Sequence, residues 1–348
     1  MTVLAPAPRP LEAKAPPLPR LDPVTRLPIL ILFPHSRCNC RCLMCDIWQA
    51  KGREELSVEE IAGSLAEWRA LGVKRVVLSG GEPLMHSQFL DLCRALRAAE
   101  VGITILSTGL LLDRYAASLP GLVDDVVVSL DGPPDVHDRI RNVPRAFARL
   151  AEGVAAVRAA DPTIGVSGRS TVQRVNCRRL SETVEAARGI GLERLSFLAV
   201  DVGSEAFNRP GGWEPEHAAG VAPSGDDLPY LEDEIAALAE EDFASGFLAE
   251  SREKLRRRLV GYFRAVLGEQ DFPPVVCNAP WVSSVIESDG TVRPCFFQPP
   301  LGNVREAGSL ARVLNSPEAV AWRRGLDTTR DAVCRRCVCS LNLREGER

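Results

Sequence analysis

Short apolar segments alternate with longer amphipathic segments from residue 29 to residue 200. The apolar segments are residues 29–33 (ILILF), 75–80, 102–108, 125–130, 163–172 and 194–200. The first is apolar at every position, as expected of a parallel strand that is buried on both faces of a sheet, and the other five are interpreted in the same way. The pattern therefore predicts six buried strands.

The segments between these strands carry helical patterns. Helices are predicted over residues 57–71, 87–100, 145–160 and 180–189, and the first of them opens with the capping box Ser57-Val58-Glu59-Glu60. Strands that alternate with helices pair in parallel through right-handed crossovers. The pattern alone fits an open doubly wound sheet and an incomplete barrel equally well.

The two ends of the chain differ from this core. Eight of the first 28 residues are proline, which predicts an extended or disordered tail. Beyond the last strand, a long loop is expected over residues 203–227, then helices over 228–241 and 251–267, and finally a hairpin with its turn at 288–290. We therefore expect four parts: a tail (1–28), an α/β core (29–201), a lid loop with linking helices (202–272) and a cysteine-rich domain (273–348).

Composition narrows the functional class. The chain has 348 residues, 45 % of them hydrophobic and 25 % charged, as in globular proteins, and a formal net charge of -4 that does not favour nucleic acid as a partner. No apolar run reaches the roughly 18 residues that cross a bilayer, and the start lacks a secretory signal, so a cytoplasmic protein with no membrane partner is expected. Eleven cysteines in such a protein indicate metal or redox sites rather than disulfides.

The strongest cysteine signal lies directly after the first strand. Cys38, Cys42 and Cys45 have the spacing C-x3-C-x2-C. Three thiolates can bind three irons of a [4Fe-4S] cluster and leave the fourth iron open for another ligand. A zinc knuckle, with Cys40 or His35 as the fourth ligand, and unligated buried thiols are alternatives that the spacing does not exclude.

Further motifs follow the next three strands in order. They are Gly80-Gly81-Glu82-Pro83, Ser107-Thr108-Gly109 and Ser129-Leu130-Asp131-Gly132. Together with the cysteine loop, this ordered set resembles the radical S-adenosylmethionine (SAM) superfamily over residues 29–200. The resemblance implies a partial (β/α)6 TIM-like barrel in which the open iron binds SAM.

The same resemblance implies which residues contact SAM. The segment Gly80, Gly81, Glu82 and Pro83 lines the methionine amine, and Ser107 and Ser129 are further cofactor-binding residues. Arg169, on the fifth strand, is a candidate partner for the methionine carboxylate, because a guanidinium presents a planar fork to carboxylates; a solvated arginine is an equal alternative. No catalytic acid or base is identified.

A second cysteine group lies in the last part of the chain. Cys277, Gly290 and Cys295 have the spacing C-x12-G-x4-C across the expected hairpin, and Cys334 and Cys337 follow as C-x2-C. Taken alone, four such thiolates also suit a structural zinc ribbon. Next to the radical SAM motifs, they resemble the SPASM/Twitch appendage, which implies one auxiliary [4Fe-4S] cluster on these four cysteines, with Cys339 as an alternative to Cys337.

The resemblance implies the reaction but not the substrate. The expected activity is reductive cleavage of SAM to a 5'-deoxyadenosyl radical that takes a hydrogen atom from the substrate, with ferredoxin or flavodoxin as reductant and the auxiliary cluster in electron transfer. A small molecule is the preferred substrate, because the proline-rich start does not form a leader-peptide module. Maturation of a peptide or protein is the alternative, and a non-catalytic iron-sulfur or zinc scaffold is the alternative of another class.

Three polar residues after the last strand are candidates for substrate contact. Asp201, Glu205 and Arg209 lie next to the expected lid loop, although charged loop residues are often only solvated. The segment 131–141 resembles one found in peptide-modifying and sulfatase-maturing enzymes, and its His137 is interpreted as a turn or cap residue. Phe296 stands where sulfatase-maturing enzymes have an aspartate, which argues against sulfatase maturation.

Overall fold

A computed structural model describes residues 16–52 and 54–346 of the chain. Its strands form one sheet in the order β6-β5-β4-β3-β2-β1-β7-β8-β9. The first six strands are β1 (Ile29–Leu32), β2 (Arg75–Leu78), β3 (Gly102–Ser107), β4 (Asp125–Ser129), β5 (Gly165–Val172) and β6 (Leu195–Ala199). They pair in parallel with their sequence neighbours, so the six predicted strands and their parallel order are confirmed.

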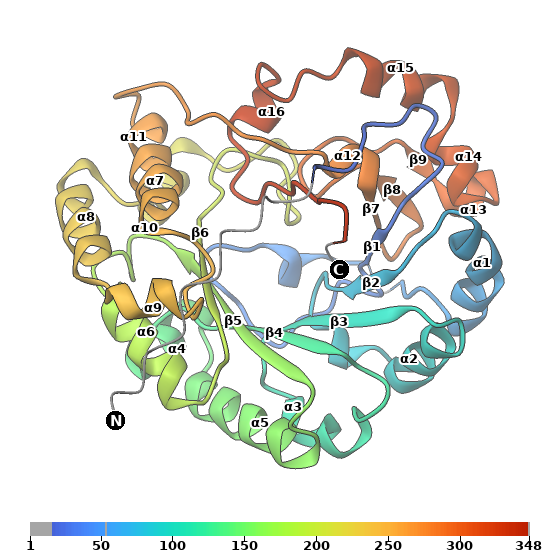
Figure 1. Ribbon diagram of the computed structural model, residues 1–348. Helices are drawn as coiled ribbons and strands as arrows, with labels where there is room; N and C mark the ends of the chain where they lie inside the picture. Colours follow the sequence, from blue (N-terminus) through green and yellow to red (C-terminus); the bar gives the residue numbers. More distant parts are fainter. Residues whose placement is uncertain (1–15, 53, 347–348) are drawn as a thin grey trace, which may run out of the picture.

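Helices cover the outside of this curved sheet, as Figure 1 shows. Those of the barrel are α1 (Val58–Ala70), α2 (Phe89–Ala98), α3 (Leu112–Tyr115), α4 (Pro134–Arg141), α5 (Ala146–Ala160) and α6 (Leu180–Gly189). The predicted capping box is present, because the Ser57 hydroxyl accepts the amide of Glu60 and the Glu60 carboxylate accepts the amide of Ser57. The architecture is a partial α/β barrel, and the doubly wound alternative is excluded.

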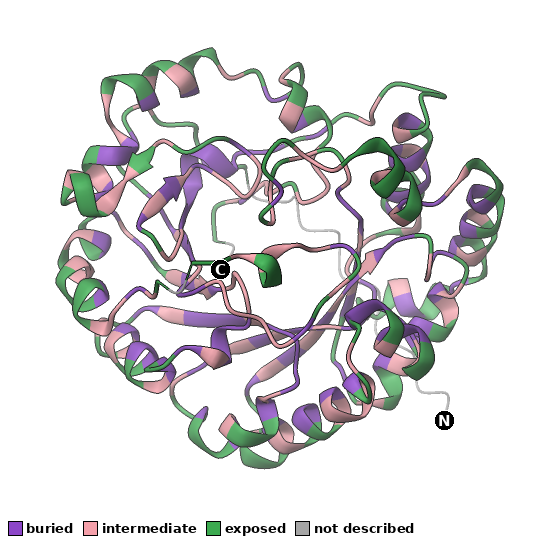
Figure 2. Cartoon of the chain, turned by 180° about the vertical axis from the view of Figure 1, so that it is seen from behind, coloured by how far each residue is buried: buried purple, intermediate pink, exposed green. Residues whose placement is uncertain are grey.

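The later strands do not have the burial expected of them. Residues of β4, β5 and β6 alternate between buried and partly exposed positions, whereas both faces were expected to be buried. The buried positions, such as Val126, Val166 and Phe197, belong to the main core that the helices close. The alternate positions lie on the opposite face of these strands from that core and keep part of their surface exposed, as the colours of Figure 2 show.

The C-terminal part continues the barrel sheet. Its strands are β7 (Ser283–Ile286), β8 (Thr291–Arg293) and β9 (Gly302–Asn303). The predicted hairpin is confirmed as the antiparallel pair β7 and β8, and β7 also pairs in parallel with β1. The cysteine-rich part is therefore joined directly to the strand that precedes the first cysteine loop.

The remaining helices link the barrel to this part and complete it. They are α7 (Pro215–Val221), α8 (Leu228–Ala237), α9 (Glu240–Ala244), α10 (Arg252–Leu255), α11 (Gly261–Val266), α12 (Ala279–Val282), α13 (Val304–Ala307), α14 (Leu310–Leu314), α15 (Pro317–Gly325) and α16 (Ala332–Arg335). The prediction of a continuous loop over residues 203–227 is thus wrong in part, because this segment contains α7, which has a proline in its first turn. Across the described residues, no helix is both long and apolar enough to span a bilayer.

The proline-rich start is ordered where the structure describes it. Leu18, Val24 and Leu27 are buried, and the amide of Leu18 donates to the carbonyl of Leu343 at 2.8 Å. Of the two predicted alternatives, residues 16–28 adopt the extended and not the disordered one, while residues 1–15 lie outside the described residues. Proline prevents a helix there, but it does not prevent an extended chain from burying the leucines between its prolines.

Candidate functional site

The first cysteine loop is held at the carboxyl end of β1 by main-chain hydrogen bonds to α4. The amide of Arg41 donates to the carbonyl of Arg141 at 3.1 Å, and the amide of Leu43 donates to that of Ile140 at 3.1 Å. Cys38, Cys42 and Cys45 are all partly buried. The loop thus presents its three thiols where the ends of parallel strands usually carry a site.

The chemistry of these thiols fits a multi-iron cluster. Burial raises the pKa of Cys38 to about 12 and that of Cys45 to about 11, and the nearby Cys42 contributes in the same direction to both. Iron binding would therefore release protons from the loop. In residues 16–52 and 54–346, no group of three or more His, Cys, Asp or Glu side chains is placed to hold a single metal ion. A zinc knuckle would need its ligands around one point, whereas each thiolate of a cubane binds its own iron.

The Gly80-Gly81-Glu82-Pro83 turn packs directly against the cysteine loop. The amide of Glu82 donates to the carbonyl of Arg37 at 2.9 Å. A Cβ atom on Gly81 would lie 1.9 Å from the Arg37 carbonyl oxygen, and one on Gly80 would lie 2.8 Å from the Cβ of Phe33. Only glycine allows this approach, so the two loops fit each other without a side chain between them.

The Glu82 carboxylate fixes the end of β3. It is fully buried and accepts hydrogen bonds from the Ser107 hydroxyl at 3.0 Å and from the amide and hydroxyl of Thr108 at 2.7 Å each. Burial raises the pKa of Glu82, and the Thr108 bonds oppose that rise. The hydroxyl oxygen of Thr108 also lies 2.9 Å from the side-chain amide of Asn39, so this contact connects the end of β3 to the cysteine loop.

The other predicted SAM contacts lie on the neighbouring strands. Ser129 and Arg169 are register partners on β4 and β5, and both are partly exposed on the inner side of the barrel. The Arg169 Nε donates to the Ser196 hydroxyl at 3.4 Å, so this side chain already has one partner. Ser107 is committed to Glu82, whereas Ser129 and Arg169 are partly exposed; their contact with SAM stays a prediction.

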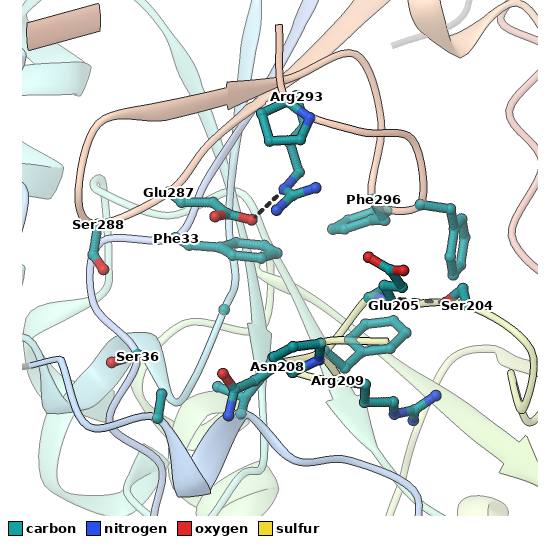
Figure 3. Close-up of a pocket in the computed structure, with 18 of the residues that line it drawn as sticks. Phe33, Ser36, Ser204, Glu205, Asn208, Arg209, Glu287, Ser288, Arg293 and Phe296 are labelled. Carbon is teal, nitrogen blue, oxygen red and sulfur yellow. Dashed lines mark hydrogen bonds and ion pairs between the residues drawn. The ribbon is translucent and has the colours of Figure 1, made fainter. Parts of the chain in front are cut away.

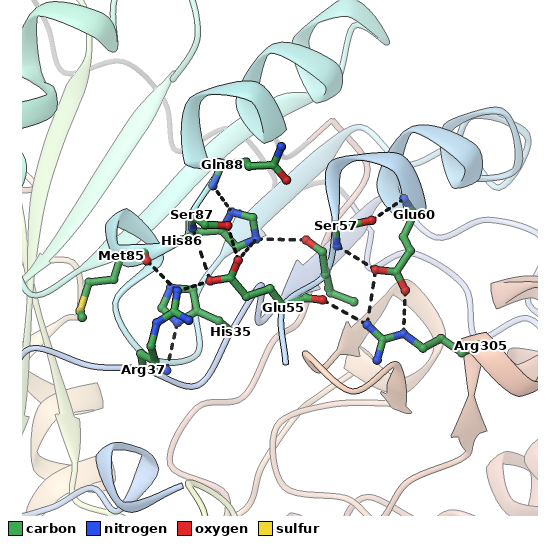
Figure 4. A network of polar contacts seen from close by, with 11 residues as sticks. His35, Arg37, Glu55, Ser57, Glu60, Met85, His86, Ser87, Gln88 and Arg305 are labelled. Carbon is green, nitrogen blue, oxygen red and sulfur yellow. Dashed lines mark hydrogen bonds and ion pairs between the residues drawn. The ribbon is translucent and has the colours of Figure 1, made fainter. Parts of the chain in front are cut away.

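A polar network supports the base of the cysteine loop (Figure 4). The carboxylate of Glu55 accepts hydrogen bonds from Arg37 and from the hydroxyl of Ser87, and the Nε2 of His86 donates to the carbonyl of Leu56 at 3.0 Å. His35 stacks on His86 and uses its Nδ1 to accept the amide of Arg37 at 3.0 Å. His35, an alternative zinc ligand from the sequence, is therefore part of this scaffold.

Two of the three substrate candidates hold the same loop from the opposite side. The Arg209 guanidinium pairs with Asp201 at 3.2 Å and donates to the carbonyl of Met44, and both charged side chains are almost fully buried. Asp201 and Arg209 thus support the loop, while Arg209 also lines the adjacent cavity, so the contact of these two residues with substrate stays a prediction. Glu205 is exposed and lines the adjacent cavity.

Arg141 is a site residue that the sequence analysis did not single out. It pairs with the buried Asp131, and its Nη1 lies 3.5 Å from the sulfur of Cys42. His137 accepts the amide of Asp131 on its Nδ1 at 3.2 Å, which agrees with its interpretation as a turn residue. Arg141 follows His137 by one helical turn on α4, so the spacing of two buried polar residues was the signal available in the sequence.

The second cysteine group also converges. The buried Cys277 packs with Cys295, and the amide of Cys337 donates to the carbonyl of Cys334 at 3.1 Å. Gln298 donates to the sulfur of Cys334 at 3.3 Å. Cys277 and Cys295 are thus in contact, Cys334 and Cys337 adjoin each other, and the choice between Cys337 and Cys339 as fourth ligand stays a prediction.

A cavity of about 830 Å³ lies between the barrel and the C-terminal part. Figure 3 shows Phe33 and Phe296 on one side and Glu205 and Arg209 from the loop after β6 on another. Phe296 directly follows Cys295 and stacks on Phe33 at 5.8 Å between ring centroids. The cavity is therefore bordered by segments that adjoin both cysteine groups.

Comparison with known proteins agrees with this arrangement. The sequence model of the radical SAM superfamily matches residues 32–188. The sequence model of the SPASM family, an iron-sulfur cluster-binding domain, matches residues 277–338. The chain is 30 % identical over 269 residues to a PqqA peptide cyclase of Ruegeria pomeroyi, covering 74 % of this chain but only 65 % of that relative. It is 27 % identical over 332 residues to the PqqA peptide cyclase of Rhizobium meliloti, covering 92 % of this chain and 81 % of the relative.

A solved structure shares the fold. Streptococcus suis SuiB bound to S-adenosylmethionine superimposes with a TM-score of 0.63 at 15 % identity, covering 91 % of this chain and 73 % of SuiB. Similarity at that identity is evidence for the architecture only.

Proposed function

Because the chain belongs to the radical SAM superfamily and carries a SPASM iron-sulfur domain, we propose that it is a radical SAM enzyme that modifies a peptide or protein. The observation that carries the substrate class is the similarity to a PqqA peptide cyclase over 92 % of the chain. This evidence supports the peptide alternative better than the small molecule expected from the sequence. A non-catalytic scaffold has no support from these relatives.

Each part of the site has a task in this reaction. Cys38, Cys42 and Cys45 would hold the first [4Fe-4S] cluster, and Ser129 and Arg169 would bind SAM beside it. When bound, the reduced cluster and SAM supply a 5'-deoxyadenosyl radical that takes a hydrogen atom from the substrate, after one electron from a reductant of the ferredoxin or flavodoxin class. Since such a radical attacks almost any C–H bond, the protein must fix the substrate and exclude other reactants.

The cavity has the properties that this task needs. Its volume of about 830 Å³ is near the upper end of the roughly 300–1,000 Å³ of ligand pockets, so it accommodates several groups of a peptide. Phe33, Phe207 and Phe296 supply apolar walls, and Glu205 supplies an exposed carboxylate. Phe296 in place of an aspartate also argues against sulfatase maturation.

The substrate class can be tested by following deuterium into 5'-deoxyadenosine. The reconstituted protein is incubated anaerobically with SAM, dithionite and a fully deuterated extract of the cells that carry its gene, with and without prior digestion of the extract by a non-specific protease. We expect deuterium in the 5'-deoxyadenosine from the intact extract and at least a tenfold loss after digestion, measured by mass spectrometry. Transfer that survives digestion would show a small-molecule substrate instead.

We further propose that Cys277, Cys295, Cys334 and Cys337 hold an auxiliary [4Fe-4S] cluster that exchanges electrons with the substrate. Four thiolates bind all four irons and leave none open. Phe296, which follows Cys295, and Val333, which precedes Cys334, line the cavity. Replacing Cys334 and Cys337 by alanine should remove about four irons per chain. SAM cleavage should persist, while the yield of modified peptide should fall at least tenfold.

The control for this experiment is Cys177→Ala, which removes a fully buried thiol of the barrel core. It should change neither the iron content nor the yield. Zinc in place of iron at the second site, or normal product formation by the double variant, would show that the C-terminal site is structural.

A further inference from the structure

The inference concerns the buried arginine next to the first cysteine loop. Arg141 is the last residue of α4, and its side chain is 8 % exposed. It forms an ion pair with Asp131, which is 0 % exposed, and its Nη1 lies 3.5 Å from the sulfur of Cys42. One guanidinium thus contacts both a carboxylate and a cysteine of the expected cluster site.

Main-chain contacts fix this guanidinium relative to the loop. The carbonyls of Ile140 and Arg141 accept the amides of Leu43 and Arg41, which flank Cys42 on both sides. On the other side, Asp131 is fixed because its Oδ1 accepts the amide of Thr171 at 2.8 Å. To leave Cys42, the guanidinium of Arg141 would therefore have to break its ion pair with a fixed carboxylate.

A structural role alone explains this arrangement poorly. A buried ion pair contributes little net stability, because the desolvation of both charges offsets their attraction. A guanidinium beside a cysteine sulfur has a different effect, since hydrogen bonds to the sulfurs and nearby charge set the reduction potential of an iron-sulfur cluster. Reduction adds an electron to the cluster, and a positive donor stabilises that added charge.

We propose that Arg141, positioned by Asp131, is a tuning residue of the first cluster: its hydrogen bond to the Cys42 sulfur raises the reduction potential and thereby favours the reduced cluster. The inference rests on the proposed function, because it requires that Cys42 ligates iron. It goes beyond that function in assigning a task to the pair Asp131 and Arg141. Arg141 and Asp131 should shift the reduction potential of the first cluster in opposite directions, since Arg141 supplies a positive charge and the negative charge of Asp131 partly offsets it.

The test is a redox titration of the anaerobically reconstituted full-length protein, followed by electron paramagnetic resonance. The signal of the first cluster is identified by its change on addition of SAM. In Arg141→Met, the ratio of reduced to oxidised first cluster at a fixed potential should fall about tenfold, which corresponds to about 59 mV for a one-electron couple. Arg141→Lys, which keeps the charge but not the planar fork, should lie between this variant and the unmodified protein.

Asp131→Asn provides the test of sign. The amide oxygen can still accept the Thr171 amide, but the negative charge is lost, so the ratio of reduced to oxidised cluster should rise. Arg323→Met is the matched control, because Arg323 is also buried and pairs with Asp22 at 2.6 Å in the C-terminal part. This control should lower the melting temperature without shifting the reduction potential of the first cluster.

Several outcomes would overturn the inference. One is an unchanged potential in Arg141→Met, and another is a shift of Arg141→Met and Asp131→Asn in the same direction, as a general loosening of the site would give. If Arg141→Met does not retain iron, the directions of the potential shifts in Arg141→Lys and Asp131→Asn still test the inference. A protein that binds no iron at Cys38, Cys42 and Cys45 would refute the proposed function as well, whereas iron with unshifted potentials would refute this inference alone.

Discussion

Replacing Cys38, Cys42 and Cys45 together by alanine is expected to abolish SAM cleavage. The variant should lose about four irons per chain, the complement of one cubane. The reason is that these thiols are the cluster ligands that we propose, on the loop that packs against the Gly80-Gly81 turn. Iron analysis and the yield of 5'-deoxyadenosine with dithionite and SAM measure the effect, which should reach the background of a reaction without protein.

Cys40→Ala is the matched control within the same loop. Cys40 is 1 % exposed and packs with Leu110 and Ala146, so it behaves as a core residue. Its replacement should cost about 1 kcal/mol for the small cavity and leave iron and cleavage intact. Loss of iron in Cys40→Ala would identify Cys40 as a fourth thiol ligand and favour the zinc-knuckle alternative. SAM cleavage by the triple variant would refute the proposal that Cys38, Cys42 and Cys45 hold the cluster.

The strand order and the cysteine groups could be predicted because they depend on local patterns. Apolar segments such as residues 29–33 identify strands, and the spacing of Cys38, Cys42 and Cys45 identifies a ligand set. The inner faces of β4 and β5 were predicted less well. Burial of a strand on two faces depends on whether a neighbour fills the second face, and in this barrel that space is left open.

The contacts that the sequence did not predict have a common physical origin. Asp201 and Arg209 were considered only as candidates for substrate contact, and residues 16–28 only as an extended or disordered segment, because each was interpreted from its own composition. In the structure, Arg209 reaches the carbonyl of Met44, and Leu18 bonds to Leu343, both far away in the chain. Contacts between distant segments are not contained in a local pattern. The spacing of His137 and Arg141 was a local signal, but it did not indicate that Arg141 lies next to Cys42.

The second large effect is expected for Gly81→Ala. The added Cβ would lie 1.9 Å from the carbonyl oxygen and 2.6 Å from the carbonyl carbon of Arg37, and these backbone atoms cannot rotate away. The turn and the cysteine loop must therefore separate, which also breaks the bond from the Glu82 amide to Arg37 at 2.9 Å. We expect a loss of about 3 kcal/mol in the free energy of unfolding, from overpacking and the lost hydrogen bond.

The effect on the reaction should be larger than the effect on stability. A displacement of about 1 Å at a catalytic site can cost roughly 100-fold in rate, so the yield of 5'-deoxyadenosine should fall by about that factor even where the variant is folded. Gly63→Ala is the matched control: Gly63 lies inside α1 and a Cβ there meets nothing within 4 Å. Alanine at an exposed helix position should stabilise the protein by about 1 kcal/mol and leave cleavage unchanged. If Gly81→Ala instead cleaves SAM within twofold of the unmodified protein, the close contact between the turn and Arg37 is not what holds the cysteine loop in place, and the support of that loop must come from α4 and Arg209.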